Sequence, residues 1–220
     1  QEWKELDINA FLIKKNAEKI FFELPKFIPE GKISFYKQLI DDFWKAGYKN
    51  FMISHLSQKL IIPKSATIAT NENVYAFNDA TIRFLNKQGI HLFCYPQENE
   101  MDNLCSLKNK KGIIPVYFYP ELFYSRMPVK VNDKFQQFSD DKNYTFQKVI
   151  KNGLTIVIPK NPVSLTQYKS KLEAKGFGRY LIDLTYVKPS DKHLKTLIRR
   201  LKHSEQTQPS VTFNFKKGLK

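Results

Sequence analysis

Apolar residues recur at helical spacing in several stretches of the chain, and each stretch is followed by a short apolar run. The first begins near Ser34, a candidate N-cap, and should end at Gly47, which suits a left-handed position after a helix. The apolar run within residues 48–54 then predicts a short buried strand. A helix followed directly by a buried strand is the repeating step of a parallel α/β sheet.

The same helix–strand step recurs along the chain. Asn78 and Asp79 are suited to cap a helix that ends at Gly89, and residues 90–95 form the next predicted strand. The remaining steps are a helix over 98–107 with a strand over 113–119, a helix from Ser164 to Gly176 with a strand over 179–186, and a last helix that begins at Ser190.

Repeated steps of this kind predict an α/β fold, built as a partial or complete (β/α) TIM-like barrel with parallel strands. Residues 130–160 have no helical period, but two apolar runs flank Asn152-Gly153, a strong hairpin signal. We therefore expect a barrel portion over residues 1–203, with a β-hairpin inserted near 130–160. A polar linker and a terminal strand are expected over residues 204–220.

The formal net charge of +15 adds a functional class to this picture. Such an excess attracts polyanions, so RNA, DNA or an acidic surface are natural partners, and a solvated lysine-rich surface is the simpler alternative. Two phenylalanines, Phe213 and Phe215, lie among the basic residues at the end of the chain, where bases could stack on them. The candidate nucleic-acid-binding residues are Arg199, Arg200, Lys202 and Lys216.

Other features concern compartment and cofactors. No run approaches the roughly 20 apolar residues of a membrane helix, so we expect no membrane association. Cys94 and Cys105 form neither a CxxC motif nor a disulfide framework, which favours a reducing, cytoplasmic location. Two thiols cannot supply the usual four cluster ligands, so we expect no metal and no cofactor.

Because the chain begins with Gln1, we expect an upstream N-terminal half of the same protein to be a partner.

From Gly47 to the C-terminus, six segments follow one another in a characteristic order: AGYKNFMIS, NENVYAFNDATIRFLNKQG, CYPQENEMDNL, IIPVYFYPELFYSRMPV, LTIVIPKNPVSLTQYKSKLEAKGFGRYLIDL and FNFKKGL. The most specific part is the helix entry at Asn78, followed after the next strand by an acidic residue, Glu98. This order of segments resembles the collagenase-like peptidase U-32 family. The resemblance implies a (β/α) barrel and a hydrolase that acts on a peptide substrate.

The sequence departs from the family pattern in two places. Relatives that hold an iron–sulfur cluster carry cysteines around the segment IIPVYFYPELFYSRM, where this chain has Leu122, Phe123 and Met127, so we do not expect a cluster. The segment that reads Lys-Ile-Glu-Gly-Arg in many relatives is Leu-Ile-Asp-Leu-Thr at residues 181–185. It keeps an acid and loses the arginine, so the chemistry either differs or has been lost.

Active groups of (β/α) barrels lie at the carboxyl ends of the strands. Tyr119 and Glu121 follow one of the predicted strands of this chain. The candidate catalytic residues there are Asp183, Glu98, Arg126 and His55. Each also has a structural interpretation. Asp183 can satisfy hydrogen bonds inside an apolar run, Glu98 can complement a helix dipole, Arg126 can stack on a ring, and His55 can bond loop backbone.

Three functions remain open at this level. The first is a U-32 peptidase-like barrel protein, although the chain has neither an HExxH nor a GxSxG motif. The second is an RNA-binding or RNA-modification-associated module without catalysis of its own. The third is a non-catalytic scaffold that packs against an N-terminal half of the same protein.

Overall fold

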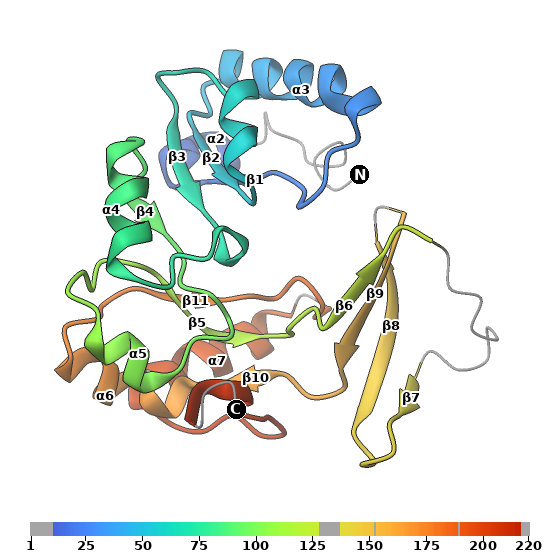
Figure 1. Ribbon diagram of the computed structural model, residues 1–220, viewed down its shortest axis with the longest axis vertical. Helices are drawn as coiled ribbons and strands as arrows, with labels where there is room; N and C mark the ends of the chain where they lie inside the picture. The colour runs from blue at the N-terminus through green and yellow to red at the C-terminus, as the bar shows by residue number, and fades with distance from the viewer. Residues whose placement is uncertain (1–10, 128–136, 152, 189, 217–220) are drawn as a thin grey trace. The chain divides into compact units, whose positions relative to one another are not determined.

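The computed structural model describes residues 11–127, 137–151, 153–188 and 190–216, which form a mixed α/β protein (Figure 1). The chain divides into two compact units. Unit 1 comprises residues 1–96 and 106–113, and unit 2 comprises residues 97–105 and 114–220.

Unit 1 is built on a four-stranded parallel sheet with the strand order β1-β2-β3-β4. Every neighbouring pair is parallel, and strands adjacent in the sequence are adjacent in the sheet. This arrangement confirms the predicted α/β class. The strands are β1 (Phe22–Glu23), β2 (Asn50–Ile53), β3 (Thr67–Thr70) and β4 (Leu92–Phe93).

The described residues of unit 1 form seven helical segments besides this sheet: α2 (Phe11–Lys15), η1 (Ala17–Lys19), η2 (Glu30–Lys32), α3 (Ile33–Lys45), η3 (Leu56–Ile61), η4 (Glu72–Val74) and α4 (Asp79–Lys87). The predicted cap of α4 is confirmed, because the Asn78 side chain accepts a hydrogen bond from the Thr81 N–H at 2.9 Å. The predicted Ser34 cap is wrong. The 3-10 turn η2 leads straight into α3, so the backbone is already helical before Ser34.

Aromatic rings form the core of unit 1 next to β1. The ring of Phe22 stacks on Phe43 of α3, with centroids 4.2 Å apart, and meets Tyr48 edge-on at 5.2 Å. Phe51 of β2 completes the cluster and is fully buried. Between the helix and the strand, Gly47 takes the left-handed conformation that the sequence predicted, with φ +101°.

Unit 2 contains a three-stranded sheet whose central strand is β5 (Ile114–Phe118). Its neighbours are the parallel β11 (Tyr180–Ile182) and the antiparallel β10 (Val163–Ser164). All five residues of β5 are buried. The helical segments of this part are α5 (Met101–Ser106), η5 (Thr166–Tyr168), α6 (Lys169–Ala174), α7 (Asp191–His203) and η6 (Phe213–Lys216).

A second, antiparallel sheet of unit 2 contains β6 (Phe123–Ser125), β9 (Leu154–Pro159), β8 (Thr145–Lys151) and β7 (Gln137–Ser139), in that order (Figure 1). The predicted hairpin is confirmed, since β8 and β9 pair continuously as far as Lys151 and Leu154. Gly153 has φ +76° in the turn, and Asn152 lies outside the described residues. The strands β6 and β7 extend the hairpin into a sheet that the sequence did not predict.

Three further expectations differ from the structure. Ser164 pairs with Tyr117 in β10, so it cannot cap α6. Residues 213–216 form a 3-10 helix and not a terminal strand, because Phe213 has φ +47°, which is incompatible with extended backbone. The strands of the described residues form three sheets, so the closed barrel stays a prediction.

Candidate functional site

The carboxyl ends of β5 and β11 bring functional side chains to one edge of a sheet. The two strands are parallel, and Tyr117 lies opposite Ile182 in their register. Residues that follow the two strands therefore emerge at the same edge, where α/β proteins place their ligands. Here β5 is followed by Tyr119 and Glu121, and β11 by Asp183.

Two tyrosines and a histidine form the first cluster at this edge. The Tyr117 hydroxyl lies 3.5 Å from Nε2 of His193, a residue of the first turn of α7. The Tyr117 and Tyr119 rings meet edge-on at 6.4 Å. Burial raises the pKa of Tyr117, and the charge of Tyr119 and a hydrogen bond to it raise this pKa further. Burial also raises the pKa of Tyr119. Both phenols therefore stay protonated at neutral pH and can donate hydrogen bonds.

Two carboxylates lie on the loops that continue from the same strands. Glu121 accepts a hydrogen bond from the Tyr186 hydroxyl, and Lys151 lies 5.9 Å from the centre of the Tyr186 ring. Asp183 is half-buried, and its side chain accepts a hydrogen bond from the Thr185 N–H at 2.8 Å. This edge thus offers carboxylates that can accept a proton and phenols that can stabilise an oxyanion.

Of the four predicted catalytic residues, Asp183 lies at this edge. Glu98 is half-buried in a turn before α5, so it is not the helix-opening acid that was expected; that position belongs to Asp102. Arg126 is exposed in the bend after β6. His55 belongs to unit 1, where its Nδ1 accepts a hydrogen bond from the Ser57 N–H at 3.3 Å and caps η3.

The carboxyl edge of the unit 1 sheet carries a polar network that the sequence did not indicate. The buried Asn71 amide donates to Oε1 of Glu23 at 2.6 Å and to Oγ of Ser54 at 2.7 Å. Ser54 in turn donates to the Leu24 carbonyl at 3.1 Å. These hydrogen bonds link the carboxyl ends of β1, β2 and β3 to one another. They therefore stabilise the edge of the sheet.

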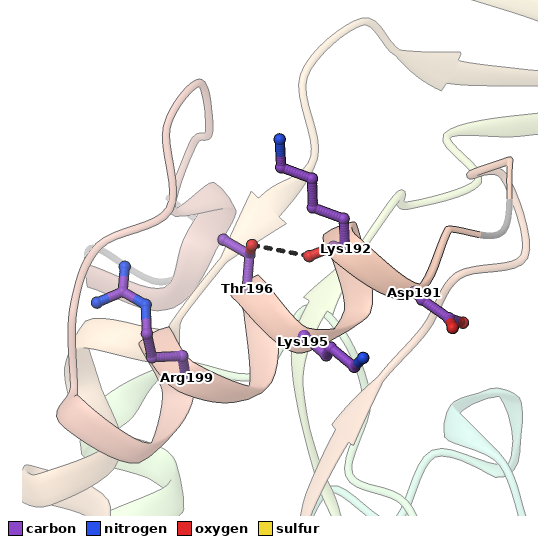
Figure 2. Close-up of a pocket in the computed structure, with 5 residues that line it drawn as sticks. All are labelled: Asp191, Lys192, Lys195, Thr196 and Arg199. Carbon is purple, nitrogen blue, oxygen red and sulfur yellow. Dashed lines mark hydrogen bonds between the residues drawn. The ribbon is translucent and has the colours of Figure 1, made fainter.

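The outer face of α7 carries the basic residues that were expected to bind nucleic acid. A shallow depression of about 480 Å³ is lined by Asp191, Lys192, Lys195, Thr196 and Arg199 (Figure 2). Arg199 also pairs with Glu205 at 3.2 Å, which reduces the charge that it offers to a ligand. The other predicted residues lie at the end of this helix or of η6: Arg200, Lys202 and Lys216.

Tyr117, Tyr186 and His193 were missed as site residues. His193 lies 76 positions from Tyr117, on a helix that the sequence marked only as basic. The alternation YFY within residues 117–119 could have indicated Tyr117, since it places Tyr117 and Tyr119 on one face of a strand. Tyr186 and His193 come from distant parts of the chain, so this alternation does not indicate them.

Among the described residues, no group of three or more His, Cys, Asp or Glu side chains is arranged to hold a metal ion. The same residues include no helix that is both long and apolar enough to cross a membrane. The chain matches no known family model, and it has no significant similarity to a curated protein or to a solved structure.

Proposed function

We propose that this chain is a U-32-like (β/α) barrel protein that hydrolyses peptide bonds at the carboxyl edge of β5 and β11. The order of the segments that resemble the family supports this proposal, as does the parallel order of β1 to β4. The observation that carries it is the convergence of Asp183, Glu121 and two protonated tyrosines on one edge of the sheet. We also propose a cytoplasmic location, because Cys94 and Cys105 form neither a CxxC motif nor a disulfide framework.

The chemistry follows from the groups at this edge. Asp183 accepts a proton from a water molecule while the water oxygen attacks the carbonyl carbon of the peptide. The Tyr119 hydroxyl donates a hydrogen bond to the oxyanion that develops. Asp183 then returns the proton to the departing amine, so that the carboxylate is regenerated and the C–N bond is broken.

Replacement of the carboxylate tests this assignment. Asp183→Asn should lower kcat/KM for a fluorogenic gelatin-derived peptide by roughly 100-fold or more, as expected for a lost general base. The matched control is Asp141→Asn, the same change in an exposed turn between β7 and β8. Circular dichroism should show that both variants keep their fold. An active Asp183→Asn variant, or a wild-type protein that cleaves no peptide, would refute the proposal.

A second candidate, RNA binding without catalysis, is favoured by the cations along α7. Lys192, Lys195 and Arg199 border one depression, and these three cations suit contacts with phosphate oxygens. Reversal of Arg199, Arg200 and Lys202 to Glu should weaken RNA binding and reduce the slope of log affinity against log salt by roughly 2, at about 0.7 per phosphate. The matched control reverses three exposed lysines of unit 1: Lys37, Lys64 and Lys87. Equal effects of the two triple changes would show that α7 has no specific role.

A further inference from the structure

The antiparallel sheet β6-β9-β8-β7 has one face with three aromatic residues. The strand register places Phe138, Phe146 and Pro159 in one row across the sheet. A second row, two residues further along β8, contains Lys148, Val157 and Phe123. Because side chains alternate between the two faces of a strand, these six side chains share one face.

The two faces of this sheet differ in exposure. On the aromatic face, Phe123 is 54% exposed, Phe138 is 41% exposed and Ile150 is 69% exposed. On the other face, Ile156 and Ile158 of the inner strand β9 are buried. Tyr124 is exposed on this second face and Thr155 is buried on the aromatic face, so each face is accessible in part. The aromatic face is the one on which exposed apolar side chains of three strands gather.

The rings occupy two separate positions on this face, and a cation lies next to one of them. Phe138 and Phe146 lie side by side, with centroids 5.6 Å apart and ring planes inclined by 33°. Phe123 lies on β6, two strands away from β8, which corresponds to about 10 Å across the sheet. Lys148, which is half-buried, follows Phe146 by two residues on β8 and lies in the row of Phe123, with Val157 between them.

We propose that this face binds single-stranded RNA, with bases stacked on Phe123 and on the Phe138–Phe146 pair and a phosphate held by Lys148. A four-stranded sheet with exposed aromatic residues is a suitable platform for stacking because every base has a π-face. Lys148 distinguishes this occupant from an apolar protein partner, since an apolar partner would desolvate the ammonium group without compensation. The net charge of +15 favours the same polyanion. The inference rests on the RNA-binding candidate function and assigns it a second surface.

The test measures binding of a fluorescein-labelled 12-residue oligouridine by fluorescence anisotropy at several salt concentrations. The variants Phe123→Leu and Phe138→Leu keep apolar side chains in the sheet but remove the aromatic faces, and each should weaken binding roughly tenfold. Their salt slope should equal that of the wild type because no charge is lost. Lys148→Met should instead reduce the slope by about 0.7.

Two substitutions serve as controls. Tyr124→Leu removes a ring that is 57% exposed on the opposite face of β6, so it should leave binding unchanged. Phe123→Trp enlarges the aromatic face and should retain or strengthen binding. Together they separate stacking on this face from a general loss of exposed rings.

The possible results separate this inference from the function on which it rests. If the leucine variants bind as the wild type does while the α7 reversal weakens binding, the stacking platform is refuted and RNA binding stands. If the wild type binds no oligouridine at low salt, both are refuted. If Tyr124→Leu weakens binding as much as Phe123→Leu does, the assigned face is wrong.

Discussion

Gly112 is packed against two aromatic rings of unit 1. A Cβ atom built at this position would lie 2.5 Å from Cε2 of Phe93 and 2.5 Å from Cε2 of Tyr95. Neither ring is free to move aside, because both are buried and the Tyr95 hydroxyl donates to the Asn109 carbonyl at 2.7 Å. The same burial raises the pKa of Tyr95 to about 12, so the phenol keeps this donor proton at neutral pH.

Gly112→Ala should therefore destabilise the protein by about 1–3 kcal/mol through overpacking. The free energy of unfolding in urea measures the effect. Gly31→Ala is the control, because no heavy atom lies within 4 Å of a Cβ at that position of unit 1. Equal stabilities of the two variants would contradict the described packing.

A second residue-scale prediction concerns Asp79 and pH. Its carboxylate accepts hydrogen bonds from the N–H groups of Lys108 and Asn109, which lower its pKa, the Lys108 bond contributing most. Because the pKa of Asp79 is lower in the folded state than the unfolded-state value of about 4, its carboxylate stabilises the fold at pH values above about 4. This contribution to the free energy of unfolding is lost as pH falls from about 4 through the folded-state pKa. Asp79→Asn should be less stable than the wild type by roughly 0.5 kcal/mol at pH 7, with the difference vanishing near pH 2–3. A pH-independent difference between their unfolding curves would contradict this origin.

At the scale of elements, the two candidate caps of unit 1 can be compared directly. Asn78 bonds the backbone at the start of α4, whereas Ser34 lies within α3 and caps nothing. Asn78→Ala should therefore cost about 1 kcal/mol, measured by thermal or urea unfolding. Ser34→Ala should be neutral or slightly stabilising because alanine is the better helix former. A larger loss in Ser34→Ala would reverse the assignment.

The helix α7 has different roles on its two sides. Leu197 is buried and anchors the helix, and His193 reaches the Tyr117 hydroxyl at the sheet edge. Lys192, Lys195 and Arg199 border the shallow depression on the outer face (Figure 2). One element thus contributes to both candidate sites, so a change on its outer face can be tested without altering the tyrosine cluster.

For the whole molecule, the charge excess predicts strongly salt-dependent binding to polyanions. With a formal net charge of +15, affinity for RNA should fall at least tenfold between 50 and 200 mM salt, by release of condensed counterions. Filter binding or anisotropy with a mixed-sequence RNA measures it. Affinity that does not change with salt would show that the basic surface makes no phosphate contacts.

The sequence determined those features that depend on a few neighbouring residues. The caps at Asn78 and Ser190 and the turn at Gly153 follow from local hydrogen bonding and backbone conformation, and the structure has them where they were predicted. The α/β class with parallel strands was also predictable, because helical periods alternate with apolar runs along the chain. Asp183 was also counted among the residues at the carboxyl ends of strands, although the predicted strand over 179–186 is longer than β11, which ends at Ile182.

Only the tertiary structure decided the rest, because pairings between distant residues leave no local signal. Ser164 resembles a helix cap in sequence, but its backbone pairs with Tyr117 of β5 and forms a strand. His193 approaches Tyr117 across 76 positions, and Asn71 bonds Glu23 across 48. The aromatic face of the antiparallel sheet depends on the pairing of four strands, of which the sequence indicated two. Register, which is set by packing across the whole sheet, therefore placed the side chains that both proposals require.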